Sequence, residues 1–188
     1  MGTGDRDRWN DKWAERGVGT GHGSQLVSLV GPHLPASGRL LDVAGGGSTD
    51  SFDFARRGLD VTVCDVSDVG LIQSRQRALA EDIILATVEA DLDVDPVPEG
   101  PWDVITVANY LNRGLFPSLV SSLAPGGVLA VVIATVTNLE QAPKPGRPYL
   151  LEADEILDLV DGLEIVHHSE AWRPNGRHEA HLIARRLN

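Results

Sequence analysis

Three consecutive glycines, Gly45 to Gly47, directly follow a short apolar run that contains Asp42. Glycine has no side chain, so a loop of this kind lets a ligand approach the backbone closely. Asp65 ends a second apolar run, twenty residues after Gly45. A carboxylate at that place can accept hydrogen bonds from both hydroxyls of a ribose. The spacing therefore permits a dinucleotide or another adenosine-containing ligand.

The positions of the glycines distinguish between these two ligands. A dinucleotide-binding loop needs the pattern G-x-G-x-x-G. Counted from Gly45, the sixth position is Asp50, whose carboxylate would repel a pyrophosphate, and counted from Gly46 the third position is Ser48. No arginine immediately follows Asp65 to bind a 2′-phosphate. A nicotinamide-dependent oxidoreductase is therefore the weaker alternative.

The elements that position these residues alternate between strand-like and helix-like runs. We predict parallel strands over 39–44, 60–65, 83–88, 102–108 and 128–136, and helices over 24–33, 48–57, 68–80, 115–123 and 152–160. Such alternation with short connections predicts a parallel sheet with right-handed crossovers. Two further strand-like runs, 163–172 and 178–186, flank Asn175-Gly176, a strong hairpin signal. We predict an α/β fold with a Rossmann-like, doubly wound, seven-stranded sheet, mostly parallel and closed by a C-terminal antiparallel hairpin.

Composition limits the classes of partner. The chain has 188 residues and a formal net charge of −11, which argues against a nucleic-acid binder and against an anionic membrane surface. The N-terminal residues lack an apolar signal core, and no apolar run approaches the ~20 residues needed to span a bilayer. The single cysteine, Cys64, excludes an intrachain disulfide and a cysteine-rich zinc site. We expect a cytoplasmic monomer or homodimer without a metal.

The length fits one main domain. Residues 1–23 are predicted to form an N-terminal helical lid and a flexible, glycine-rich joint. Residues 24–188 are predicted to form a single ligand-binding domain.

Five segments, in order, resemble the motifs of class I S-adenosylmethionine-dependent methyltransferases. They are the glycine motif at 40–47, followed by 61–67, 90–92, 102–111 and the L-x-P-G-G turn at 123–129. The resemblance covers about residues 39–187. A narrower resemblance, to small bacterial methyltransferases of the tellurite-resistance type, is carried by 110–117 and 146–151. The chain departs from that type at Ser48-Thr49-Asp50, where an Arg-Asn pair is usual, which puts contacts to the methionine part or the substrate in question.

The resemblance implies S-adenosylmethionine as cofactor and roles for particular residues. Asp42 would orient the amino end of the cofactor, Asp65 would accept from the ribose, and Asp91 would accept from the adenine amino group. The alternative for Asp91 is that it belongs to a solvated loop, because it lies in an acidic stretch of the kind that usually forms one. Asn109 would contribute mainly its backbone carbonyl beside the sulfonium. The full cofactor-binding set is Asp42, Ala44, Gly45, Gly47, Asp65, Val66, Asp91, Leu92, Asn109 and Tyr110.

A second set of residues is expected at the lid and the substrate. Trp9 and Trp13 are four residues apart on one helix face, as a lid or as a hydrophobic anchor. The complete set of candidates is Trp9, Trp13, His22, Asn112, Arg113 and Tyr149. No residue is assigned as a catalytic base, because methyl transfer by in-line displacement depends mainly on alignment.

The expected function is methyl transfer from S-adenosylmethionine to a small-molecule acceptor. The alternative is a non-catalytic protein that binds S-adenosylmethionine or S-adenosylhomocysteine without turnover. A nucleic-acid methyltransferase is disfavoured by the net charge and because residues 109–112 do not match the N/D-P-P-Y/F tetrapeptide.

Overall fold

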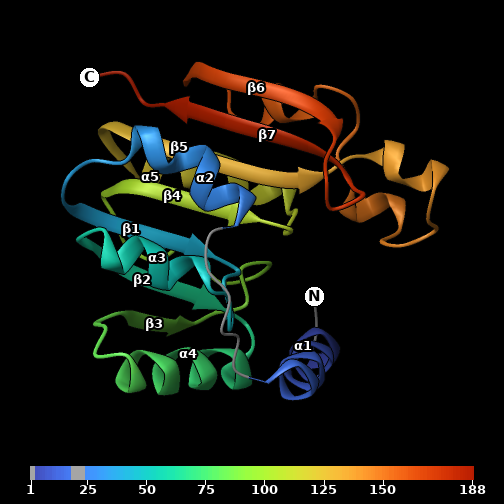
Figure 1. Ribbon diagram of the computed structural model, residues 1–188. Helices are drawn as coiled ribbons and strands as arrows, with labels where there is room; N and C mark the ends of the chain where they lie inside the picture. The colour runs from blue at the N-terminus through green and yellow to red at the C-terminus, as the bar shows by residue number, and fades with distance from the viewer. Residues whose placement is uncertain (1–2, 18–23) are drawn as a thin grey trace.

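A single mixed sheet forms the centre of the protein. The computed structural model describes residues 3–17 and 24–188. Seven strands lie in the order β3-β2-β1-β4-β5-β7-β6 (Figure 1). They are β1 Gly38–Val43, β2 Leu59–Asp65, β3 Ala86–Glu89, β4 Trp102–Ala108, β5 Leu123–Ala134, β6 Glu164–Trp172 and β7 His178–Arg185. The strands from β3 to β5 pair in parallel, and β7 is antiparallel to both β5 and β6. The predicted sheet and its closing hairpin are confirmed.

Helices cover both faces of the sheet. Apolar side chains of α2, α3 and α4 pack on one face, and those of α5 and α6 pack on the other. The bounds are α1 Thr3–Arg16, α2 Gln25–Val30, α3 Asp50–Arg56, α4 Asp68–Ala80, α5 Phe116–Ser122 and α6 Glu155–Leu159. Short 3-10 helices span Gly31–His33, Arg113–Leu115, Val136–Glu140 and Arg147–Tyr149. The N-terminal helix α1 lies beside α4, at the end of the sheet where β1 and β2 terminate (Figure 1).

The strand register decides which side chains share a face. Asp42 of β1 is opposite Thr106 of β4, and Thr106 is opposite Ala130 of β5. Side chains that face one another across neighbouring strands point to the same side of a sheet. The row that begins at Asp42 therefore lies on the face covered by α2 and α3, near the carboxyl ends of the parallel strands.

Four elements differ most in extent from the sequence prediction. The fifth strand begins at Leu123 rather than at residue 128 and includes the predicted L-x-P-G-G turn, because Leu123 already pairs with Trp102 of β4. The predicted helix over 24–33 ends at Val30 and continues as a 3-10 turn, since Pro32 has no amide hydrogen to donate. The third strand begins at Ala86 rather than at residue 83, because the Ile83 amide donates back to the Ala78 carbonyl and Ile84 is 92% exposed. The last helix begins only at Glu155, after a residue with left-handed backbone. Among the described helices, none has the length and apolar content that crossing a bilayer requires.

Candidate ligand-binding site at the carboxyl edge of the sheet

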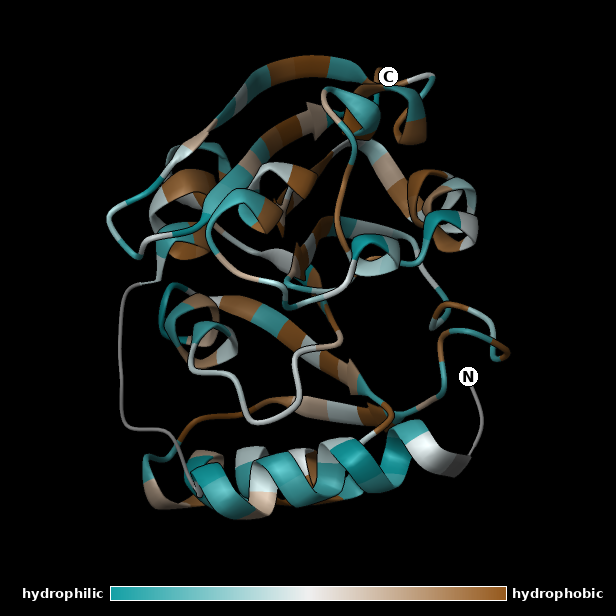
Figure 2. Cartoon of the chain, turned by 90° about the vertical axis from the view of Figure 1, so that its right-hand side faces the viewer, coloured by the Kyte–Doolittle hydropathy of each residue, from teal (hydrophilic) through white to brown (hydrophobic). Residues whose placement is uncertain are grey.

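The carboxyl ends of β1, β2 and β4 meet at the edge of the sheet that is turned toward the viewer in Figure 2. β1 lies between β2 and β4, and the chain order reverses at this point: β3 follows on the β2 side and β5 on the β4 side. Open α/β sheets bind ligands at such a reversal. The predicted site residues come from the loops that leave these three strands.

The glycine loop connects β1 to α3 by a tight turn. Ala44 and Gly46 have left-handed backbones, with φ of 54° and 50°. The Gly45 amide donates to the Cys64 carbonyl of β2 at 3.3 Å. A Cβ on Gly45 would stand 2.6 Å from a carboxylate oxygen of Asp42, so a larger residue would displace that side chain. The loop is therefore pressed against the ends of β1 and β2, with its backbone at the edge of the sheet.

Asp42 lies beneath the glycine loop and is fully buried. Its carboxylate accepts hydrogen bonds from the hydroxyls of Ser51 and Thr106, the latter at 2.9 Å. Burial, together with the negative charges of Asp50 and Asp65, raises the pKa of Asp42 to about 7, although the hydrogen bonds from the Ser51 and Thr106 hydroxyls lower it. Asp42 thus sits at the base of the site and already has two partners from the protein.

Asp65 ends β2 on the other side of the loop. Its carboxylate accepts from the Ser67 amide at 2.7 Å and is also bonded by the amides of Gly46 and Val66. Burial raises the pKa of Asp65 to about 6, although the hydrogen bonds from these three backbone amides lower it. The predicted ribose acceptor is therefore a buried carboxylate in direct contact with the glycine loop. Val66, the predicted adenine neighbour, follows it and is half-buried.

The predicted adenine segment lies next to Asp65. The Ala90 amide donates to the Asp65 carbonyl at 3.0 Å, which places the following residues, Asp91 and Leu92, beside the end of β2. One Asp91 carboxylate oxygen accepts from the Asp93 amide at 3.1 Å. Leu92 is buried among the apolar side chains on the α5 side of the sheet.

Asp93 joins this segment to the loop after β4. Its Oδ1 accepts from the Tyr110 hydroxyl at 2.9 Å and from the Asn112 side-chain amide at 2.8 Å. Burial and the bond to Asp93 raise the pKa of Tyr110, so the phenol is neutral. A shallow pocket of about 400 Å³ opens here, lined by Asp93, Leu111, Asn112 and Arg113. Two predicted residues, Tyr110 and Asn112, thus hold one wall of the site together.

The helix α1 borders the glycine loop through Trp13. A Cβ on Gly46 would stand 2.6 Å from the Trp13 indole, and one on Gly47 would stand 3.0 Å from it. The Gln73 side chain of α4 donates to the Trp13 carbonyl at 2.8 Å. Figure 2 shows α1 as a mostly hydrophilic helix running across the edge of the sheet. Trp13 is therefore the apolar contact of a polar helix, and it touches the site itself.

Asn10 anchors the same helix at the start of α4. Its side-chain amide donates to Asp68 at 2.7 Å, and its carbonyl oxygen accepts from the Ser67 hydroxyl at 2.7 Å. Ser67 also caps α4 by accepting from the Gly70 amide. Trp9, predicted to share a face with Trp13, has the Lys12 ammonium of its own helix 4.3 Å above its ring.

The remaining predicted substrate residues are placed differently. Arg113 forms two bonds with Glu155, at 2.5 and 2.8 Å, and also donates to the carbonyls of Pro148 and Leu150. Its guanidinium therefore connects the loop after β4 to the segment before α6. Tyr149 lies in that segment and is 47% exposed. His22 falls outside the described residues.

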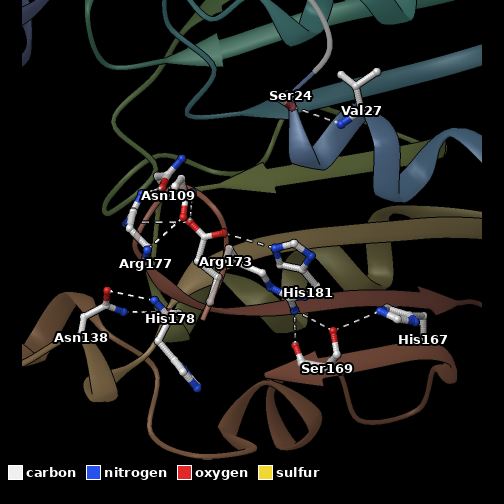
Figure 3. Close-up of polar contacts among 12 residues, drawn as sticks. Ser24, Val27, Asn109, Asn138, His167, Ser169, Arg173, Arg177, His178 and His181 are labelled. Atoms are coloured by element: carbon white, nitrogen blue, oxygen red, sulfur yellow. Dashed lines mark hydrogen bonds and ion pairs between the residues drawn. The ribbon is translucent and has the colours of Figure 1, made fainter. Parts of the chain in front are cut away.

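Several residues of the site carried no signal in the sequence. Ser51 and Thr106 reach Asp42 only because the start of α3 packs against the end of β1 and β4 pairs beside β1. The terminal hairpin contributes Arg177, Glu179 and His181. Arg177 donates a hydrogen bond to Asn109, the residue that follows β4 (Figure 3). The Asn-Gly turn predicted the hairpin, but not that its side chains reach the end of β4.

One group of side chains in the described part of the chain has the types that bind metals. Ligand-type atoms of Asp154, which precedes α6, and of His168 and Glu170 on β6 lie within 4.8 Å of one another. The Glu170 carboxylate accepts from the Asp154 amide at 3.0 Å. This group ties β6 to the start of α6, away from the carboxyl ends of β1 and β2.

Comparisons with known proteins are informative at this point. None of the protein-family models matches the chain. Over 116 residues it is 33% identical to the ubiquinone/menaquinone biosynthesis C-methyltransferase UbiE of Cereibacter sphaeroides, a match that covers 57% of this chain and 44% of the relative. The chain thus spans less than half the length of this curated relative.

Two solved structures share nearly the whole architecture. Magnesium protoporphyrin IX methyltransferase (ChlM) from Synechocystis, with bound SAH, has a TM-score of 0.75 at 18% identity, covering 98% of each chain. The chain has the class I methyltransferase fold. TehB from Haemophilus influenzae shares this fold with a TM-score of 0.71 at 20% identity, covering 94% of this chain and 66% of that one. The strand order and the terminal hairpin agree with the expected resemblance.

Proposed function

We propose that this chain is an S-adenosylmethionine-dependent methyltransferase that acts on a small-molecule acceptor. The observation that carries the proposal is Asp65, a buried carboxylate at the end of β2 that accepts a hydrogen bond from the Gly46 amide of the glycine loop. The 33% identity to a named methyltransferase supports the same activity. The cytoplasmic location, the monomer or homodimer, and the lid over 1–23 are parts of the same proposal.

The charge of the site fits this cofactor. Asp50 and Asp65 each raise the pKa of Asp42 by Coulombic repulsion, so negative charge is concentrated around the glycine loop. S-adenosylmethionine carries a sulfonium and an ammonium, and an opposite charge nearby favours the ionised carboxylates. A pyrophosphate would add to the repulsion.

Each predicted residue has a role in this proposal. Asp65 accepts from the ribose hydroxyls and Asp91 from the adenine amino group, with Val66 and Leu92 beside the ring. The backbone at Ala44, Gly45 and Gly47 lines the methionine part, while Asp42 beneath it orients the amino end. Asn109 and Tyr110 follow β4 and close the third side.

The bound cofactor supplies a methyl group made electrophilic by the sulfonium. The protein's part is to hold the acceptor nucleophile in line with that methyl group. Such positioning is worth about 7 to 11 kcal/mol. The acceptor is proposed to lie against the shallow pocket at Asn112 and Arg113. Tyr149, together with Trp9 and Trp13 of α1, is proposed to contact the acceptor from the other side. His22 is likewise proposed as a residue near the acceptor.

A thermal-shift series tests the proposal. S-adenosylmethionine, S-adenosylhomocysteine and NAD are each added to the protein, and a ligand at 100 times its dissociation constant adds about 2.7 kcal/mol of stability. We expect the first two to raise the melting temperature and NAD to leave it unchanged. Stabilisation by NAD alone would contradict the proposal.

Variants of β2 make the test specific. Asp65→Ala and the less disruptive Asp65→Asn should lose most of the shift. Asp60→Ala, at the exposed start of the same strand, is the matched control and should keep it. Release of S-adenosylhomocysteine during incubation with a panel of phenols, thiols and amines then separates transfer from binding alone.

A further inference from the structure

The terminal hairpin reaches across the sheet to the end of β4. Arg177, in the turn between β6 and β7, donates through Nη1 to the side-chain oxygen of Asn109, 68 residues earlier in the chain (Figure 3). β5 lies between β4 and β7, so this contact spans a whole strand. It is the feature at this edge that the proposed cofactor contacts do not explain.

Arg177 is itself held in place by its own hairpin. Its Nε lies 3.7 Å from Oε1 of Glu179, and its amide donates to the Asn175 side chain at 3.0 Å. Asn175 in turn donates to the same Glu179 oxygen at 3.1 Å. The guanidinium is therefore fixed from the hairpin side before it meets Asn109.

Glu179 is a firm anchor because it is ionised. The residue is 2% exposed, and burial by itself would raise its pKa. Hydrogen bonds from His181 and Asn175, with the charge of Arg177, outweigh burial and hold the pKa of Glu179 below its usual value. The negative charge of Glu179 also compensates the positive charge of Arg177 at the edge of the site.

Asn109 needs such support because its backbone is unusual. Its φ is 57°, in the left-handed region, and its amide donates to the Val132 carbonyl at 2.9 Å. Asparagine tolerates this conformation better than most residues, but it persists only where the surroundings hold it. The hydrogen bond from its backbone amide to Val132 fixes one end of Asn109, and Arg177 fixes its side chain. Together they determine the direction of the Asn109 backbone carbonyl.

We propose that Arg177, held in place by Glu179, is a positioning residue for Asn109. By fixing the Asn109 side chain it directs the backbone carbonyl oxygen of Asn109, so that this oxygen favours a cationic sulfonium over a neutral thioether. The inference rests on the proposed function, since it concerns the same cofactor. It assigns the terminal hairpin a part in discriminating the methyl donor from its demethylated product.

Calorimetric titration with S-adenosylmethionine and with S-adenosylhomocysteine tests the inference without any methyl acceptor. Arg177→Gln should weaken binding of the methyl donor about tenfold, within the usual range for coupling between sites, and binding of the product less than twofold. Asn109→Ala should give the same change in the ratio. The double variant should add nothing to it, because both changes remove one interaction.

Arg173→Gln is the matched control. Arg173 lies in the same turn and carries the same charge, but it donates to Ser169 of β6, so its loss should leave the ratio of the two affinities unchanged. A hairpin with a purely structural role would lower the melting temperature of Arg177→Gln and leave the ratio unaltered.

The sign of the effect separates positioning from simple charge. Removing a cation would by itself strengthen binding of the sulfonium, so tighter binding by Arg177→Gln overturns the inference, as does equal weakening of both ligands. A wild-type protein that binds neither ligand overturns the proposed function together with this inference. A wild-type protein that binds both, with an unchanged ratio in the variant, overturns this inference alone.

Discussion

The Thr106 hydroxyl of β4 donates a 2.9 Å hydrogen bond to the Asp42 carboxylate of β1, at the point where the chain order of the sheet reverses. With Ser51 it supplies the two partners of a carboxylate that burial holds at a pKa of about 7. Two hydroxyl bonds do not compensate fully for the loss of water around a charge. The base of the site is therefore a point of electrostatic cost, which a bound cation would relieve.

This cost predicts how stability depends on pH. The pKa of Asp42 is raised on folding, so the folded state holds a proton that the unfolded state has lost between about pH 4 and pH 7. Stability is fully present below that window and falls as pH rises through it, by at most about 1.4 kcal/mol per pH unit. Urea unfolding at pH 5 and pH 8 measures the difference.

Asp42→Asn removes the titration while keeping the size of the side chain. The variant should therefore lose less stability than the wild type between pH 5 and pH 8. Asp60→Asn, an exposed carboxyl of β2, is the control and should follow the wild type. An Asp42→Asn variant whose stability falls as steeply as that of the wild type would show that Asp42 is ionised throughout.

The contact of Trp13 with the glycine loop indicates that the N-terminal helix contributes to ligand binding through this residue. Its indole covers Gly46 and Gly47, whereas Trp9 has its described ring contacts on its own helix, with Arg8 and Lys12. Trp13→Ala should release α1, increase amide hydrogen exchange over Thr3–Arg16 and weaken binding of S-adenosylhomocysteine several-fold. Trp9→Ala should change exchange little. Equal effects of the two variants would refute this difference between them.

The fold was largely predictable because its signals are local. Periodic apolar runs indicated the strands, the Asn175-Gly176 turn indicated the hairpin, and the alternation of strands and helices with short connections indicated parallel pairing. The predicted start of β3 was wrong because the Ile83 amide donates to the Ala78 carbonyl and Ile84 is exposed, which the apolar run itself does not reveal.

The site was predictable only for residues on the backbone path of the motifs. Asp42, Asp65 and Asn109 lie where strand ends must place them. Arg113 lines the pocket where the acceptor is proposed, but the bond of its guanidinium to Glu155, 42 residues away, had no signal in the sequence. Arg177 was missed because its partner is 68 residues distant. Contacts of this range depend on how finished elements pack, and no spacing in the sequence encodes them.

Ser24 stabilises the buried carboxylate of Asp50 at the start of α3. The Ser24 hydroxyl donates to the Asp50 carboxylate at 2.7 Å, and its oxygen accepts from the Val27 amide as the cap of α2. Ser24→Ala removes both interactions and should cost about 1 to 2 kcal/mol of unfolding free energy. Ser24→Thr should retain most of it. Ser28→Ala, on the exposed side of α2, is the control, and an equally large loss there would contradict the role of Ser24.

Two arginine–glutamate pairs of similar chemistry differ in burial, so we expect them to contribute differently to the free energy of unfolding. Arg113 is 38% exposed at its side chain and bonds both Glu155 and two carbonyls, whereas Arg147 is 64% exposed and bonds Glu152. Exposed pairs contribute about 0 to 1 kcal/mol because water screens them. Arg147→Gln should therefore change stability by less than about 0.5 kcal/mol.

Arg113→Gln should cost more, about 1 to 2 kcal/mol after allowance for its partial exposure. Its loss frees two backbone carbonyls as well as the carboxylate, so hydrogen exchange should rise over 147–151. Urea unfolding and exchange of both variants, at low and at high salt, provide the measurement. If high salt abolishes the cost of Arg113→Gln, the contact is a screened surface pair and the segment before α6 is held by its apolar residues instead.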